Sequence, residues 1–552
     1  MGTSRRSQRA DGPTIVASNG GMTRRELLAG LGLGVGATLV LGACTMPAPG
    51  ATPPKPPPGV PDPAPFAEGI MSGDPLPGAG TLWTRVSPPA DGRDVPVLWT
   101  VAEDPAFSSI VAGGVVTAAA ANDHCLTVPV AGLATDRWYF YRFETSEGTG
   151  VPAAVSRTGR LRTAPAPGAS TDRLRYVFSS CQQLNDSWFV AHKAVAAEPD
   201  LDFFMHLGDY IYVSDSGTQT LEDYRALYRR WRNQPYLRDL HAAVPTVAMW
   251  DDGEFYNGVD RTGPAERLAN GRRAWFDYFP LANPGDDRAY RGFGWGDLAE
   301  MSVIDVRSYR DPALDAINYV TDQRAYDSSR TTLGSEQFGW LTQRLAASTT
   351  KWRLVGNQYA FSPWRLLNLE FLRPFNPDLP SNAGIYAPAE AWDDYLQERR
   401  DLLQFLADRG VTDTIFNSGD AHVYLATQMQ PDYDNPASPV VAFDFTTGSL
   451  TADPDPRRAF FPDLPPDIAE GIIRIAEQWM IGQNRPYLRH INLVNQGYTL
   501  VDVTPEETTV TMRVVDTFDP DAGAVDAAKF RIVRGSRRIE TLHASNTLGS
   551  FS

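Results

Sequence analysis

The chain has 552 residues, of which 42% are hydrophobic and 21% charged, with a formal net charge of −16 and a pI near 5.0. Such an acidic composition argues against a nucleic-acid partner, because binding to a phosphate backbone requires a basic surface. About 490 residues follow the N-terminal region, more than one hydrophobic core of up to about 250 to 300 residues accommodates, so we expect at least two domains.

Residues 1–44 have the pattern of an export signal. The twin-arginine sequence TRRELL at 23–28 leads into a glycine-laced apolar stretch over 27–43, which is shorter than the about 20 residues of a membrane span. The stretch ends in LGAC, which resembles a bacterial lipobox, so Cys44 is expected to carry a lipid; an ordinary cleavage site is the alternative. We therefore expect export by the twin-arginine translocase to the periplasm or cell exterior, with membrane contact only through Cys44.

A proline-rich segment and a β-rich segment come next. Residues 45–65 predict a semi-rigid extended tether. Residues 66–167 hold short aromatic and β-branched runs at 82–86, 97–101 and 138–143, with Pro, Gly and Asp turns between them. This pattern predicts an N-terminal β-sandwich of the immunoglobulin or fibronectin III type. We expect this domain to carry no chemistry.

Residues 172–535 have a different pattern, in which buried strand-like runs alternate with helix-like stretches such as 222–231 and 393–406. Strands that alternate with helices indicate an α/β layer fold. The alternating runs 498–503 and 508–515 predict a hairpin that completes one sheet. We therefore expect the second domain to be an α/β domain.

Side chains that can bind metals follow four of the buried runs. Ligand sites of open α/β sheets lie beyond the carboxyl ends of the strands, so we expect these side chains to meet at one site. Sulfur with phenolate and carboxylate oxygen suits a ferric ion, and clustered carboxylates suit calcium. The alternative is a buried cysteine, loop carboxylates and a half-buried tyrosine without any metal. The four sets are Cys181; Asp209 and Tyr212; Asp251, Asp252 and Glu254; and Asp420 and His422.

These motifs resemble those of the PhoD-like alkaline phosphatases and phosphodiesterases, a branch of the calcineurin-like metallophosphoesterases. The resemblance extends from about residue 66 to about residue 532. It implies a metallophosphoesterase fold with two sheets packed face to face and helices outside, and it implies Fe3+ and Ca2+ as cofactors. The matching motifs are SCQ (180–182), GDYIY (208–212), WDD (250–252), DVRSYR (305–310) and GDAH (419–422).

The resemblance implies an iron site formed by Cys181, Asp209 and Tyr212. With Cys44 in the lipobox and Cys181 on the metal, only Cys125 of the three cysteines remains. No disulfide framework is therefore expected, despite export.

The resemblance also implies a calcium site, to which Asp252 or its neighbour Asp251 bridges, and which Asp420 closes together with His422. A metal ion lowers the pKa of a bound water and so produces a nucleophile near neutral pH. The residues with an implied catalytic role are Asp209, Asp252, His422 and Arg307, the last as a clamp for the substrate phosphate.

Gly253 departs from the family pattern, in which a histidine usually follows the paired aspartates. In calcineurin-like enzymes that histidine is the candidate acid for the leaving oxygen, and such proton transfer contributes about 10²- to 10⁴-fold to the rate. Either Glu254, Tyr256 or His422 replaces it, or the enzyme prefers leaving groups that need no proton.

The sequence thus predicts an exported, metal-dependent phosphoesterase that hydrolyses small phosphate monoesters, diesters or both, used for phosphate acquisition. Two alternatives stay open. One is a surface lipoprotein with a degenerate phosphatase domain, which Gly253 favours and the retained set of ligand-type side chains disfavours. The other is a phosphodiesterase acting on lipid or teichoic-type substrates.

Overall fold

The structure is a computed structural model. The expected signal peptide (1–44) and nearly all of the expected tether (45–65) lie outside the residues that it describes. Within the described ranges, no helix has the length and apolar character needed to cross a bilayer. The described ranges are 62–184, 187–214, 217–282, 288–314, 323–379, 382–386, 391–452, 461 and 463–544.

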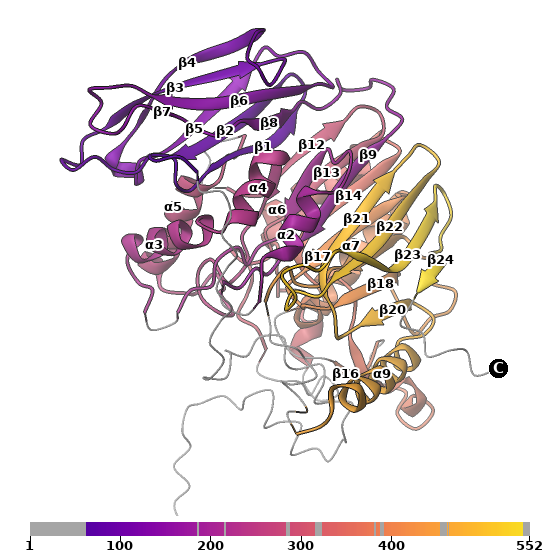
Figure 1. Ribbon diagram of the computed structural model, residues 1–552. Helices are drawn as coiled ribbons and strands as arrows, with labels where there is room; N and C mark the ends of the chain where they lie inside the picture. Colours follow the sequence, from indigo (N-terminus) through magenta and orange to yellow (C-terminus); the bar gives the residue numbers. More distant parts are fainter. Residues whose placement is uncertain are drawn as a thin grey trace, which may run out of the picture.

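A ten-stranded sheet runs through the molecule from the N-terminal to the C-terminal strands (Figure 1). Its central strands β9, β10 and β11 are parallel, and β21 and β22 form the hairpin predicted for the C-terminal region, with Val503 opposite Thr508. In spatial order the strands are β24 (Glu540–Ala544), β23 (Val525–Val533), β22 (Glu507–Val515), β21 (Gln496–Val503), β9 (Leu174–Ser179), β10 (Phe203–His206), β11 (Thr246–Ala248), β1 (Ile70–Leu76), β2 (Ala79–Arg85) and β5 (Cys125–Ala131).

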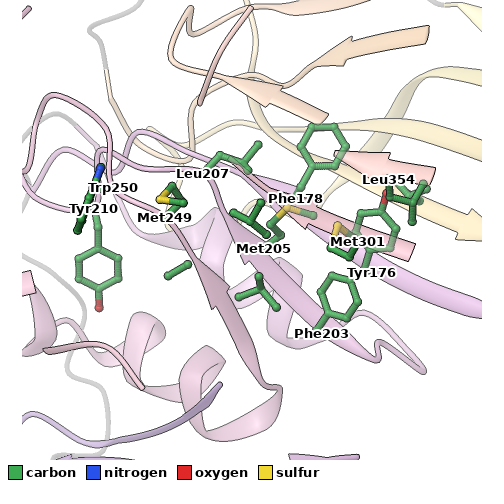
Figure 2. Close-up of a cluster of buried hydrophobic side chains, with 14 of the residues drawn as sticks. Tyr176, Phe178, Phe203, Met205, Leu207, Tyr210, Met249, Trp250, Met301 and Leu354 are labelled. Carbon is green, nitrogen blue, oxygen red and sulfur yellow. The ribbon is translucent and has the colours of Figure 1, made fainter. Parts of the chain in front are cut away.

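A seven-stranded sheet packs against it. Figure 2 shows part of the core between the two sheets, where Tyr176, Phe178 and Met205 of the first sheet meet Met301 and Leu354 of the second. In spatial order its strands are β12 (Arg291–Trp295), β13 (Ala299–Val303), β14 (Trp352–Tyr359), β17 (Thr414–Gly419), β19 (Ala442–Thr446), β18 (Tyr424–Met429) and β20 (Leu488–Asn492).

Helices cover the outer faces of both sheets. α2 (Val190–Ala196) and α4 (Pro235–Ala243) pack on the ten-stranded sheet. α6 (Gly334–Ala347), α7 (Leu396–Arg409) and α9 (Pro466–Gln483) pack on the seven-stranded sheet. The expected α/β layer architecture is therefore confirmed, and α7 begins three residues after the predicted position 393.

The remaining elements are short or peripheral. They are α3 (Leu221–Arg232), which matches the helix predicted over 222–231, α5 (Ala265–Tyr278), the pair β15 (Arg365–Asn368) and β16 (Gly384–Tyr386), and the 3-10 turns η2 (Ala120–Asn122), η3 (Gln323–Tyr326), η4 (Glu370–Leu372) and η5 (Trp392–Tyr395).

The N-terminal strands form two layers around a core of their own. One layer is the β1, β2 and β5 end of the ten-stranded sheet, and its apolar side chains share a core with those of the other layer. The immunoglobulin or fibronectin III topology stays a prediction. The other layer consists of β4 (Ile110–Ala118), β3 (Val95–Ala102), β6 (Trp138–Thr145) and β7 (Ala154–Val155), with β8 (Gly159–Arg162) also paired to β6.

The first layer is continuous with the α/β part, because β1 pairs in parallel with β11 at Gly73 and Thr246. β1 is buried along nearly all of its length rather than at alternate positions, as expected of a strand covered on both faces. Asp123 adds a polar connection, since it accepts hydrogen bonds from Arg85 of β2 and from Arg229 of α3. Burial raises the pKa of Asp123, but these bonds hold it below its usual value.

Candidate metal centre

The turns that follow β9, β10, β11 and β17 meet where the two sheets come together. Cys181 donates its backbone N–H to Gly208 O (3.1 Å), which joins the turn after β9 to the turn after β10. Asp420 donates its N–H to Ser180 Oγ (3.2 Å), which brings in the turn after β17 from the other sheet. Gly253, in the turn after β11, donates to Asp209 Oδ1 (2.8 Å). The four predicted strand ends thus form one site.

One group of ligand-type atoms contains sulfur. Ligand atoms of Cys181, Asp209 and His422 all lie within 4.8 Å of one another. Tyr212 joins this group, because its hydroxyl lies 3.4 Å from His422 Nε2. Burial, with Asp209 and Asp420 close by, raises the pKa of the Cys181 thiol well above its usual value. A thiolate at this position therefore requires a cation.

A second group consists of carboxylates. One oxygen from each of Asp209, Asp251, Asp252 and Asp420 lies within 4.8 Å of the others, so Asp209 belongs to both groups. Arg307, which is 1% exposed, donates to both oxygens of Asp251 and to Asp420 Oδ1 (3.1 Å), and lies 3.5 Å from Asp252. Four ionised carboxylates and one guanidinium leave three negative charges in a largely buried site, which is unfavourable unless cations bind.

The electrostatics of these carboxylates differ from one another. Burial and neighbouring carboxylates, Asp252 foremost, raise the pKa of Asp209 well above its usual value. The pKa of Asp251 is also raised well above its usual value by burial, although Arg307 opposes the shift. Burial raises the pKa of Asp252 as well, but Arg307 and the N–H of Gly258 (2.8 Å) hold it below its usual value. Cations in the cluster would remove this mutual repulsion.

Four of the ligand-type residues have left-handed backbone conformations. Their φ angles are 63° at Cys181, 57° at Asp209, 63° at Asp420 and 56° at His422. This region is unfavourable for residues other than glycine, and a strained backbone costs about 1 to 3 kcal/mol per residue, which structures retain mostly at functional sites. The turns therefore hold the ligand side chains in place at a conformational cost.

Glu254 supports the site, a role that the sequence did not indicate. Its carboxylate accepts backbone N–H groups of Tyr210 (2.7 Å), Asp209 (3.0 Å) and Asp251 (2.8 Å), so it ties the turn after β10 to the turn after β11. The side chain is fully buried, and burial raises its pKa to about 7 although these bonds oppose the shift. Both oxygens face the backbone, which favours positioning over the proton donation suggested above.

The structure gives a reason why a residue without a side chain occupies position 253. A Cβ at this position would lie 2.6 Å from both Asp209 Oδ1 and Ile211 O. The backbone of residue 253 therefore passes directly against the carboxylate of Asp209, a candidate metal ligand, and its φ lies outside the left-handed region. Of the other suggested acids, Tyr256 has its ring under the Arg267 guanidinium, 4.7 Å away.

Gln182, which follows Cys181, also stabilises the site through hydrogen bonds. The side chain of Gln182 bonds His192 Nε2 through its Oε1 (2.7 Å) and donates through its Nε2 to Tyr210 O (3.0 Å), while the backbone carbonyl of Gln182 accepts the Trp231 indole N–H (2.7 Å). Gln182 was noted in the sequence only as part of a motif. The partners are up to 49 residues away, so no local pattern could have indicated these contacts.

All predicted ligands are thus brought together. Arg307 lies in the site, with its guanidinium directed to carboxylates; its role as a phosphate clamp stays a prediction.

Comparison with known proteins identifies the family. The sequence model of the PhoD-like phosphatase family matches residues 176–512, and that of the family's N-terminal domain matches residues 53–165. The chain belongs to the PhoD-like phosphatase family. Alkaline phosphatase D of Bacillus subtilis (strain 168) is 30% identical to this PhoD-like chain over 504 residues, 84% of the chain and 80% of the relative.

A solved structure of PhoD is also similar. It superposes with a TM-score of 0.75 at 28% identity, and the match covers 88% of this chain and 93% of that one. This PhoD-like protein is therefore a phosphoric ester hydrolase, as the sequence motifs indicated.

Proposed function

We propose that the protein is an exported phosphatase that binds Fe3+ and Ca2+ and hydrolyses small phosphate monoesters, diesters or both to release phosphate outside the cytoplasm. The observation that supports it best is the membership of Asp209 in both ligand groups. A carboxylate shared in this way suits two cations that act on one substrate.

The donor types suit two different metals. Thiolate, phenolate and carboxylate in the first group suit Fe3+, with Cys181, Asp209 and Tyr212 as ligands. The second group offers only carboxylate oxygens, which hard cations such as Ca2+ prefer. Bound metals would activate water near neutral pH and neutralise charge on the phosphoryl oxygens.

The chain itself positions these groups and admits the substrate. Asp420, His422 and Tyr212 are partly exposed, whereas Cys181 and Asp251 are buried. The substrate therefore approaches from the side of the β17 turn. His422 lies at this open side with its imidazole close to Tyr212, where it is placed to exchange a proton with the leaving group.

The proposed export rests on the sequence pattern of residues 1–44. We propose the twin-arginine translocase as the partner and a lipid on Cys44 as the membrane anchor. A folded chain carried by this route can bind its iron before it reaches an oxidising compartment.

Metal analysis of the purified full chain, combined with turnover of aryl phosphate monoesters and diesters, tests the proposal. We expect iron and calcium in the protein, loss of both turnover and metal in Asp209→Asn, and neither loss in Asp408→Asn, an exposed aspartate of α7. Activity in a protein that holds zinc alone would contradict the metal assignment. Absence of turnover with a full metal complement would favour the degenerate phosphatase.

A further inference from the structure

β4 is the end strand of the five-stranded N-terminal sheet and pairs only with β3 among the described residues (Figure 1). An end strand presents backbone N–H and C=O groups along its free side, and these groups can pair with a strand of another chain. Monomeric proteins therefore usually protect such strands by shortness, by proline or by charged side chains.

β4 lacks all three protections; a fourth kind, a β-bulge, occurs only at its start, where the pairing with β3 shifts between Ile110 and Ala112. It runs for nine residues with the sequence IVAGGVVTA, which contains neither a charge nor a proline. Each of the other end strands of the three large sheets has at least one of these protections. The protected ends are β5 with the exposed Pro129, β7 with two residues, β12 with Arg291, β20 with the exposed Arg489, and β24 with Glu540.

Apolar side chains are exposed on both faces beside this edge. On the outer face Val115 is 69% exposed and lies opposite Leu98 of β3, which is 40% exposed. On the inner face Ala112 and Val116 pack against the sandwich core yet stay partly exposed. Apolar side chains of the sandwich core thus remain partly exposed to solvent at the free edge of β4.

We propose that β4 pairs antiparallel with β4 of a second copy of this chain and so joins the two N-terminal sheets across a two-fold axis. In such an interface each strand meets itself, so a charge near its centre would face a like charge; β4 has none. Gly113 and Gly114 lie at the centre of the strand, between Ala112 and Val115, where they let the backbones approach. The added strand would cover Val116 and Ala112.

The sheet also supplies a matched control position. Val115, Leu98, Glu144 and Val155 lie opposite one another in a row across the sheet, so Val155 is on the same face but at the far edge. Val155 is 46% exposed. A lysine there adds the same charge to the same face without touching β4.

Sedimentation velocity on the purified full chain tests the proposal. We expect wild type and Val155→Lys to sediment with twice the chain mass of 60.6 kDa, and Val115→Lys and Thr117→Lys to sediment as single chains with unchanged phosphatase turnover. Thr117 is exposed, so a second variant is available should the first fold poorly. A monomeric wild type would overturn the proposal and would favour a strand of another protein as partner. A dimer that persists in both β4 variants, with the turnover of wild type, would place the interface elsewhere.

Discussion

Replacement of Gly253 by alanine should damage the metal centre, although it adds only one methyl group. The Cβ would lie 2.6 Å from Asp209 Oδ1 and from Ile211 O, so one of these groups must move. Overpacking of this kind costs about 1 to 3 kcal/mol. Since about 1.36 kcal/mol in the barrier changes a rate tenfold, we expect a loss of about 5- to 150-fold in kcat/KM if the cost falls on the transition state.

The assay compares kcat/KM for an aryl phosphate ester with the metal content of the same samples. Gly339→Ala serves as control, because Gly339 lies in α6 and a Cβ there meets nothing within 4 Å. This variant should keep its activity and gain slightly in stability, by about 0.5 to 1 kcal/mol, as glycine is unfavourable inside a helix. Gly253→Ala should lose activity together with metal, because Asp209 belongs to both ligand groups.

The same reasoning applies to Gly253→His, which would restore the residue usual in the family. If a glycine is needed only because of its close approach to Asp209, the histidine should lower turnover of alkyl and aryl esters alike. A rise in alkyl-ester turnover, with metal content intact, would refute the steric argument and would show that the missing acid limits the enzyme.

Three further predictions concern other residues. Glu254→Gln removes the acceptor of at least one of three backbone N–H groups. Each hydrogen bond to a charged group contributes about 1.5 to 3 kcal/mol. The metal content and the melting temperature of this variant should therefore both be lower than those of wild type. Tyr212→Phe should abolish a visible absorption band from phenolate and Fe3+, and a colourless wild type would exclude that ligand. Burial lowers the pKa of His192 and His206 from 6.5 to about 3. Between these two pH values the unfolded chain therefore binds more protons than the folded chain. The free energy of unfolding should then decrease as the pH falls below 6.5, by up to about 1.36 kcal/mol per pH unit for each histidine. In chemical denaturation, the midpoint of His192→Gln should depend less steeply on pH than that of wild type, and an equal slope would contradict this.

The convergence of the candidate ligands could be predicted because the ends of buried strands are recognisable in the local sequence. Cys181, Asp209 and Asp420 each follow a buried run, and in parallel sheets such positions converge. Glu254 was visible as a third carboxylate near Asp251, but its part in joining two turns depends on backbone N–H groups more than 40 residues away. The role of Gly253 likewise depends on a carboxylate 44 residues earlier in the chain.

The layers of the fold were predictable, whereas the connection between them was not. Apolar and aromatic runs indicated β2 and β3, and alternation with helices indicated the α/β region. The pairing of β1 with β11 involves a single register pair, Gly73 and Thr246, separated by most of the N-terminal sandwich. Short parallel pairings between distant segments carry no periodic signal, which is why the sequence indicated two separate domains.

The continuous ten-stranded sheet has a consequence for how the chain can be divided. The family sequence model of the N-terminal domain ends at residue 165, and that of the phosphatase domain begins at residue 176. The sheet crosses that boundary, so a cut there would remove β1 from β11 and leave a short, fully buried strand as an unpaired edge close to the turns that carry the candidate ligands. The continuous sheet is therefore larger than either family sequence model, and a fragment beginning at residue 172 would contain all the candidate ligands without the strand that supports one side of them.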